Sequence, residues 1–489
     1  MKKLLSLLLV ATLVLTLSAA LIPAQAQEYV KLTWAQGTGA DAPNDVAEVN
    51  EALNVISREK LGVEVDIVYL TNDQLNTKTQ AGELYDMYFT CDWYNHFATA
   101  VNVTGLFADI TDYIQTVTPD LYATMPEKVW ELAKVNGRLY SIPVKKDYCP
   151  EIFIVYDKGF FDSEGMELPA TMDKLAELEP YLEKFVEKHP GVYPLQMGGY
   201  YSGIDGFFNY IDRTASIGFN YNKGGTEEGR KIISVFEDDQ MIERMTTLHE
   251  WYKKGWTNPD AATLTESSLD RKINYFKIAQ CWDGYDGYTA AYGYETGLVR
   301  ISGPYLSTSG VQGSMNALCV TLEDDPAKLE LALKYQELVN TDKKYRDMLR
   351  YGIEGVHFNY RDDGAVVQTE KGKSDYGPWA FSQGSYSLSS LPAPDETTPV
   401  NLTQWEEYFK ACDTAQVAED VGFVFDSQSV QAQIAAIGNV KETYLKVMFS
   451  GTVDPAEYVP KVIAEMEAAG LREVIAEAQR QFDEFKAAQ

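Results

Sequence analysis

Histidine and cysteine are scarce in this sequence, with 4 histidines and 5 cysteines among 489 residues. No two histidines are spaced to bring both imidazoles to one metal ion, and no cysteines form a C-x-x-C pair, so neither a catalytic zinc site nor a dense disulfide framework is encoded. The chain also lacks a G-x-S-x-G turn and a P-loop, which removes the usual local geometry of serine acyl transfer and of phosphate cleavage. We therefore expect no metal, no cofactor and no catalytic residues.

Basic residues are also few relative to acidic ones. Lysine and arginine total 42 against 72 aspartates and glutamates, which gives a formal net charge of −30 and a pI near 4.5. A surface this negative repels phosphate backbones at long range. Nucleic acid is therefore excluded as an expected partner.

Long apolar runs are limited to the start of the chain. Two lysines precede the apolar residues 4–22, and the small residues Ala24 and Ala26 follow. This order is typical of a secretory signal peptide and predicts that residues 1–26 are removed, leaving a protein in the periplasm or secreted. Four hydroxyl-bearing residues in the run disfavour the alternative of an uncleaved anchor helix, and no lipobox cysteine lies beside the cleavage point.

The remaining chain has the composition of a globular protein of two or three domains, with 45% hydrophobic residues. Apolar spacing predicts a strand at 29–34, a helix at 45–60 and a second strand at 63–67, which is a β-α-β unit. A third strand is expected at 83–90. Ligands of such open sheets bind beyond the carboxyl ends of the strands, so we expect the functional loops there.

Further along the chain, an Asn136–Gly137 pair predicts a hairpin turn. The run 144–157 carries no turn signal and suits a strand that crosses between two lobes. Further crossings are expected within 302–320 and near 351–360. Helices are predicted at 171–189, with a break at Pro180, at 226–256, and in two C-terminal stretches separated by Gly470.

Aromatic side chains recur beside short polar and charged residues at the predicted strand ends and loops. A sugar has apolar C–H faces and a rim of hydroxyls, so its site needs flat aromatic surfaces and polar groups around them. This pattern predicts a carbohydrate site, although any single aromatic residue could equally belong to the core. The candidate ligand-binding residues are Trp34, Asp92, Trp93, Lys145, Asp147, Trp282, Asp283, Tyr285 and Trp379.

Two other patterns are weaker. The Gly37-Thr38-Gly39-x-x-Ala42 sequence imitates a dinucleotide fingerprint, but the acid needed at the end of the next strand is missing, because Asp66 lies inside that strand. We interpret the glycines as a loop that reaches a ligand. The sequences around 283–287 and 362–364 approximate a calcium loop without completing it, so bound calcium stays open.

Several segments together resemble the extracellular solute-binding protein family 1, the binding components of carbohydrate ABC importers. Within it, the nearest resemblance is to the LipO-like branch with an added C-terminal domain of unknown function. The lipobox cysteine common in Gram-positive relatives is absent. The segments are YDMYFTCDW (85–93), NGRLYSIP (136–143), YGIEGVHFNY (351–360), GFVFD (422–426) and the C-terminal residues 454–485.

The resemblance implies an α/β fold of two periplasmic-binding-protein-like lobes with a hinge between them and an extra C-terminal helical part. Lobe 1 would comprise 27–144 and about 312–358, and lobe 2 would comprise 145–311 and about 359–489. The family's ligand loops would correspond here to those holding Trp34, Trp93, Lys145 with Asp147, Trp282 with Asp283, and Glu354.

The expected function is that of a monomeric, non-enzymatic receptor outside the cytoplasm. It would capture a sugar or oligosaccharide by closing its hinge and present it to the permease subunits of an ABC importer. Two alternatives stay open: a secreted hydrolase or lyase that acts on glycans with a pair of carboxylates, and a sensor ectodomain that binds the same class of ligand.

Overall fold

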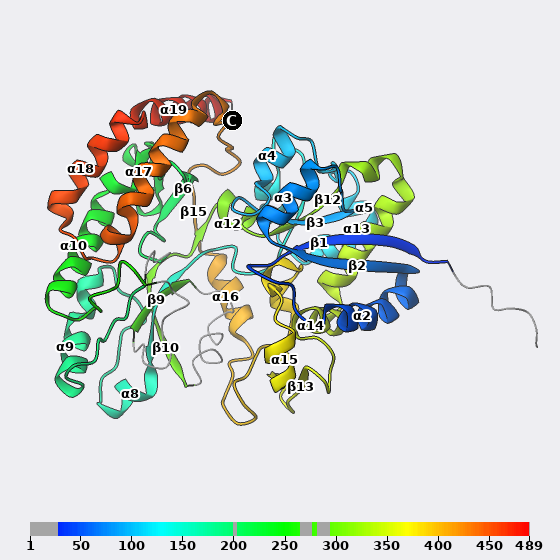
Figure 1. The fold of residues 1–489 in the computed structure, drawn as a ribbon, viewed down its shortest axis with the longest axis horizontal. Coiled ribbons are helices and arrows are strands. Elements are labelled where there is room, and N and C mark those ends of the chain that lie inside the picture. Colours follow the sequence, from blue (N-terminus) through cyan, green and yellow to red (C-terminus); the bar gives the residue numbers. More distant parts are fainter. Residues whose placement is uncertain (1–27, 199–202, 265–275, 281–293, 489) are drawn as a thin grey trace, which may run out of the picture.

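The computed structural model describes residues 28–198, 203–264, 276–280 and 294–488. They form two α/β lobes that lie side by side (Figure 1), as expected. Lobe 1 is defined by the hydrophobic cores that gather residues from 32–149 and 306–412. Lobe 2 is defined by a core that gathers residues from 152–305 and 418–482. Each lobe is therefore made of separated stretches of chain.

The sheet of lobe 1 begins with the predicted β-α-β unit. β1 (Val30–Gly37) pairs in parallel with β2 (Val63–Leu70), starting at Val30 opposite Val63, and α2 (Val46–Leu61) connects the two strands. β3 (Met87–Thr90) lies on the other side of β1 and is also parallel to it. The carboxyl ends of these strands consequently meet at one edge of the sheet.

Two further strands complete this sheet in the described part of the chain, and its order is β2-β1-β3-β12-β4, in which only β12 is antiparallel to the others. β12 (Met315–Leu318) pairs with β3 on one side and with β4 (Ile142–Pro143) on the other. β12 comes from the later return of the chain, so lobe 1 cannot be completed until the chain has passed through lobe 2.

Helices cover both faces of the sheet (Figure 1). Trp34 points to the face packed by α2 and α13 (Pro326–Thr341). Ala35 points to the opposite face, packed by α3 (Asn72–Gln80) and α4 (Phe97–Asn102). This alternation follows from the two-residue period of a strand. The other elements of lobe 1 are α5 (Ile114–Val117), α6 (Pro119–Ala123), α7 (Glu127–Ala133), α12 (Thr308–Gln312), α14 (Lys343–Tyr351), β13 (Phe358–Tyr360), β14 (Val366–Gln368), α15 (Glu370–Asp375) and α16 (Gln404–Cys412).

Lobe 2 has two small antiparallel sheets among its described residues. One has the order β10-β5-β9 and the other β6-β7-β8. The strands are β5 (Ile152–Asp157), β6 (Phe208–Asp212), β7 (Ile217–Asn220), β8 (Ile233–Ser234), β9 (Phe276–Gln280) and β10 (Thr296–Ser302). The helices that precede the C-terminal part are α8 (Lys158–Ser163), α9 (Glu179–Lys188) and α10 (Asp239–Lys253).

Three C-terminal helices pack on lobe 2: α17 (Gln431–Phe449), α18 (Pro455–Ala468) and α19 (Leu471–Ala487). The predicted stop at Gly470 is confirmed, since this residue has a φ of 102° between α18 and α19. Val462 and Met466 of α18 are fully buried, and α18 packs against α10 and α17. The apolar stripe read from the sequence is therefore the face that joins the C-terminal part to lobe 2.

The chain crosses between the lobes at three places in the described structure. The first crossing lies within 144–151 and the second within 302–308. The third lies within 412–418, because 359–412 packs on lobe 1 instead of lobe 2. The third crossing therefore lies more than 50 residues after the position near 351–360 at which it was expected. The apolar residues that decide it contribute to the lobe 1 core: Tyr376, Tyr386, Leu391, Trp405 and Tyr408.

The helix predicted at 226–256 is also shorter than expected. Helix α10 begins at Asp239, where the Asp238 side chain accepts hydrogen bonds from the first-turn amides, and β8 and short turns occupy the residues before it. Pro180 begins α9 instead of breaking it, since proline fits the first turn of a helix. Within the described residues, no helix combines the length and apolar character needed to cross a membrane.

Candidate functional site

Two of the predicted ligand residues meet in a cluster of aromatic rings on lobe 1. We call this cluster the aromatic patch; it consists of Phe89, Trp93, Tyr94, Trp379 and Phe381. The ring centroids of Trp93 and Trp379 are 5.6 Å apart at an interplanar angle of 65°. Trp93 is 45% exposed, so one indole keeps a large area in contact with solvent although its neighbours are packed. An exposed indole on a rigid aromatic support is a suitable surface for an apolar ligand face.

The loop after β3 holds Trp93 in place. Asn95 and His96 both adopt positive φ values, 60° and 44°, and the Asn95 amide donates to the Asn72 side chain at 3.0 Å. The Tyr94 hydroxyl donates to the carbonyl oxygen of Leu70 at 3.0 Å. The loop is therefore tied to the end of β2, at the same edge of the sheet.

The Gly37-Thr38-Gly39 sequence supports the other indole. A Cβ atom at Gly37 would lie 2.8 Å from Cε3 of Trp379, and one at Gly39 would lie 3.1 Å from its Cζ2. The indole thus rests on bare backbone at the end of β1. The glycines serve close packing of Trp379, which explains a motif that resembled a dinucleotide loop.

This packing gives a direct test. We expect Gly37→Val to displace the Trp379 indole and to lower the free energy of unfolding by about 1–3 kcal/mol, because the pocket has no room for the added methyl groups. Gly377→Ala is the matched control, since a Cβ there meets nothing within 4 Å, and should change the stability by less than about 0.5 kcal/mol. Urea unfolding and near-ultraviolet circular dichroism measure both. Equal stability of the two variants would contradict the packing.

An ion pair connects the edge of the aromatic patch to lobe 2. Asp92 Oδ2 lies 3.6 Å from Nε of Arg213, which follows β6. Both side chains are about half exposed, so the pair contributes little stability, at most about 1 kcal/mol. The ion pair shows instead where the loop lies: the loop that holds Trp93 faces lobe 2.

Trp34 is in the core and not at a ligand surface. Its side chain is 0% exposed, its ring makes an edge contact with Tyr335 of α13 at 5.7 Å, and its indole N–H is hydrogen-bonded within the sheet. A ligand cannot reach a ring enclosed on all sides. This corrects the expectation for Trp34.

Lys145 and Asp147 lie in the first crossing segment. Lys145 places its Nζ 5.0 Å from the centroid of the Phe409 ring, and burial lowers the pKa of its ammonium. Asp147 is buried and pairs with Lys146 at 2.7 Å. These charges lie within the hinge, where they are held by neighbouring residues.

The remaining candidates are Glu354 and the group Trp282, Asp283 and Tyr285. Glu354 lies in the exposed turn between α14 and β13. Trp282, Asp283 and Tyr285 lie outside the described residues, so their role stays a prediction. Sequence reasoning did not select Phe89, Tyr94 or Phe381; the position of Phe381, two residues after Trp379, is the signal that could have found it.

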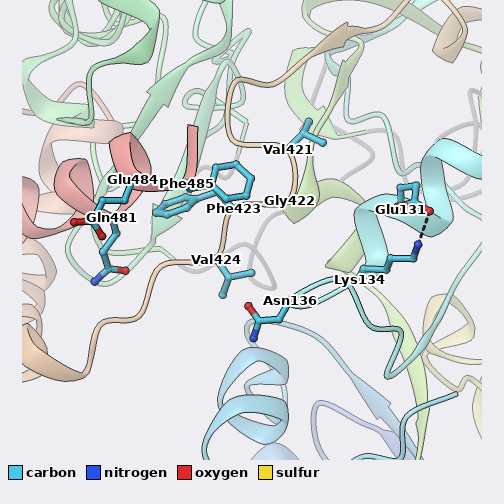
Figure 2. A pocket seen from close by; sticks show the side chains of 11 residues that line it. Glu131, Lys134, Asn136, Val421, Gly422, Phe423, Val424, Gln481, Glu484 and Phe485 are labelled. Atoms are coloured by element: carbon cyan, nitrogen blue, oxygen red, sulfur yellow. Dashed lines mark hydrogen bonds and ion pairs between the residues drawn. The ribbon is translucent and has the colours of Figure 1, made fainter. Parts of the chain in front are cut away.

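A cavity of about 570 Å³ lies between the lobes at a second place (Figure 2). Lobe 1 contributes α7 and the Asn136–Gly137 turn, and lobe 2 contributes the segment 421–424 and the end of α19. The predicted hairpin turn is confirmed: Asn136 and Gly137 have φ values of 51° and 77°, and Val135 and Arg138 exchange backbone hydrogen bonds. Because both lobes supply its walls, the volume of this cavity depends on how far the lobes are closed.

The acidic and histidine side chains that come together do not suit a metal ion. Asp45, Glu48 and His357 form one such group in the described chain. The Ile353 amide donates to Nδ1 of His357 at 3.0 Å, which leaves the ring proton on Nε2, where it faces Asp45 at 2.9 Å. A metal would need that nitrogen unprotonated, and Lys371 already pairs with Asp45. The group is therefore an ion-pair network.

Two family models match parts of the chain. The model of the bacterial extracellular solute-binding proteins matches residues 40–267, and that of a C-terminal domain of unknown function, DUF3502, matches residues 420–487. Residues 40–267 therefore resemble the bacterial extracellular solute-binding proteins. The assignment of the chain to the LipO-like branch stays a prediction.

Three relatives span nearly the whole chain. A carbohydrate ABC transporter substrate-binding protein of Streptococcus pneumoniae is 24% identical and aligns with 91% of this chain and 89% of its own. The polygalacturonan/rhamnogalacturonan-binding protein YtcQ of Bacillus subtilis is 22% identical, and the alignment covers 88% of this chain and 87% of YtcQ. The crystal structure of the N-glycan transport solute-binding protein NgtS of S. pneumoniae superimposes with a TM-score of 0.80 at 22% identity. The superposition covers 93% of this chain and 99% of the NgtS chain. These likenesses establish the two-lobed fold.

The C-terminal match begins at Asp420, a buried carboxylate beside the third crossing segment. Burial raises the pKa of Asp420 from 3.8 to about 6. The folded protein therefore favours the protonated form, and the stability that Asp420 contributes below about pH 4 is lost as the pH rises through about 6.

Asp420→Asn should remove this loss. The difference in the free energy of unfolding between Asp420→Asn and the wild type should be about 2 kcal/mol more favourable to the variant at about pH 8 than at about pH 4. Urea unfolding at both pH values measures it. Asp413→Asn is the control, because its side chain is 74% exposed, and it should show no such gain. A difference between wild type and Asp420→Asn that does not change with pH would contradict a buried, protonated carboxyl.

Proposed function

We propose that this solute-binding protein captures a sugar or oligosaccharide between its lobes and delivers it to the permease of an ABC importer. The observation that carries the proposal is the half-exposed indole of Trp93, which rests on the aromatic patch and faces lobe 2 across the Asp92–Arg213 pair. Indole faces cover the C–H faces of a sugar, while carboxylate and guanidinium groups meet its hydroxyls.

Lobe closure supplies the mechanism. A ligand that touches Trp93 on lobe 1 and polar groups on lobe 2 binds the closed state better than the open state, so it shifts the population toward closure. Micromolar capture corresponds to roughly −8 kcal/mol, of which the ligand spends part on this shift. The Asp92–Arg213 contact is weak enough for a bound hydroxyl to replace it.

The relatives support the same class of ligand. Two of them carry names that describe carbohydrate or polygalacturonan/rhamnogalacturonan binding, and the NgtS structure is described as an N-glycan transport protein. Delivery to a permease and a monomeric state are parts of this proposal. Trp282, Asp283 and Tyr285 would add lobe 2 contacts to the same ligand.

Isothermal titration against a panel of neutral and acidic oligosaccharides tests the proposal, with tryptophan fluorescence as a second signal. We expect saturable binding of at least one member and a fluorescence change at saturation. The same mixtures should be assayed for new reducing ends, because a glycan hydrolase would produce them. The absence of binding across the panel, or turnover abolished by replacing one carboxylate, would overturn the proposal.

A sensor ectodomain would bind the same ligands, so it is distinguished by its partner. Reconstitution with the permease in vesicles should give uptake that depends on the binding protein and on ATP. Ligand binding that supports no uptake but activates a membrane-bound kinase would assign the protein to sensing.

A further inference from the structure

The three crossing segments are joined to one another. β11 (Tyr305–Leu306) in the second segment pairs in parallel with β15 (Gln416–Val417) in the third. The first segment is joined to α16, which leads into the third, through the Tyr408 hydroxyl. This hydroxyl accepts from the Cys149 amide at 2.9 Å and donates to the Cys149 carbonyl oxygen at 2.5 Å. The hinge therefore contains a fixed contact between the backbone at Cys149 and one face of α16.

Cys412 lies on that same face of α16. It follows Tyr408 by four residues, one helical turn, and residues at this spacing are neighbours on a helix surface. Cys149 is 0% exposed and Cys412 is 2% exposed, and both belong to the core of lobe 1. The Cys412 side chain is near enough to act on the Cys149 thiol, and together with burial it raises the pKa of that thiol above its ordinary value. Two buried thiols from the first and third crossings thus come close together at the hinge.

The other two described cysteines are not arranged in this way. Cys91 follows β3 and Cys319 follows β12, and these strands are antiparallel, with Met87 opposite Leu318 and Thr90 opposite Met315. The register places Cys91 and Cys319 at opposite ends of the ladder, so no bond can join them without breaking the sheet. They supply matched controls, because all four described cysteines are buried and none is bonded to another in the structure.

We propose that Cys149 and Cys412 form a disulfide bond in the exported protein, which joins the first and third crossing segments of the hinge. The bond is made by thiol–disulfide exchange with a small-molecule or protein disulfide outside the cytoplasm. One thiolate attacks that disulfide and releases one thiol, and the second cysteine then attacks the mixed disulfide and releases the other. The two protein thiols are oxidised and the donor disulfide is reduced to two thiols.

The site has consequences for when the bond forms and what it does. Because only thiolates exchange and the Cys149 thiol is buried, exchange takes place before α16 docks during folding. The bond encloses about 260 residues, including most of lobe 2, and long loops give large entropic stabilisation in the chain-entropy model. It would keep the lobe 1 ends of two crossing segments together while the lobes rotate.

Peptide mapping of the secreted full-length protein tests this directly. The protein is denatured without reductant, alkylated, digested and analysed by mass spectrometry. We expect the peptides containing Cys149 and Cys412 to be linked and to separate on reduction. Cys91→Ser and Cys319→Ser should keep the link, whereas Cys149→Ser and Cys412→Ser should each lose it and leave the partner alkylated.

The melting temperature of refolded protein supplies a second measurement, which does not depend on whether the cysteine variants are secreted. Wild-type protein refolded with oxidised glutathione should melt about 5 °C higher than protein refolded with reduced glutathione. This difference should vanish in Cys149→Ala/Cys412→Ala. Alkylation of both thiols in the secreted and the oxidatively refolded protein, a link from either one to Cys281, or identical melting of the two wild-type preparations would overturn the proposal.

Discussion

Replacing Trp93 with alanine is expected to weaken oligosaccharide binding at least tenfold, or about 1.4 kcal/mol. The indole is 45% exposed and rests against Trp379 and Phe89, so it offers a ligand a large, rigid surface that alanine cannot replace. The melting temperature should change by only about 2 °C, because half of the side chain is already in water. Titration calorimetry with a glycan identified in the panel measures the affinity.

Tyr193→Ala is the matched control for Trp93→Ala. Tyr193 is also an exposed aromatic residue, 38% accessible, but it lies after α9 in lobe 2. Its removal should leave both affinity and melting temperature unchanged. If Trp93→Ala binds as tightly as the wild type, the aromatic patch is not the ligand site; if it fails to fold, Trp93 belongs to the core.

Replacing Trp34 with alanine is expected to have the opposite profile. The ring is fully buried between β1 and α13, and removal of a buried tryptophan costs about 3–5 kcal/mol, since it loses the transfer free energy and leaves a cavity. Urea unfolding should show this loss. The chain that remains folded should keep its affinity for the ligand.

Trp34→Phe makes the test independent of expression of the alanine variant. Phenylalanine fills much of the space but leaves no donor for the hydrogen bond to Asn316, so an intermediate loss of stability is expected. A Trp34→Phe protein with normal unfolding and greatly weakened ligand binding would contradict the assignment of Trp34 to the core.

The contrast between these two tryptophans shows what the sequence could and could not predict. Both were expected at the carboxyl edge of the lobe 1 sheet. Trp34 lies inside β1, three residues before its end, where the strand period sends it into the face covered by α13. Trp93 lies beyond the end of β3, in a loop that the Asn95 and His96 conformations turn outward. The position of each strand end decides the outcome, and apolar alternation does not locate that end to within one or two residues.

The hinge shows a similar limit. The first two crossings follow from local signals: an extended run without a turn, and a glycine-rich stretch between strands. The third does not, because the residues between 359 and 412 form short elements whose partner lobe is not encoded in their own pattern. Tyr376 and Trp405 decide it by packing into the lobe 1 core, a contact with residues far away in the chain.

By itself, the sequence determined the β-α-β unit, the Asn136–Gly137 turn and the C-terminal helices. These depend on backbone sterics and on side-chain periods within about 20 residues. The tertiary structure alone decided which indoles are exposed, where the chain crosses for the third time, and that Cys149 lies beside Cys412. Burial and proximity of this kind arise from packing between distant segments, and no local pattern contains that information.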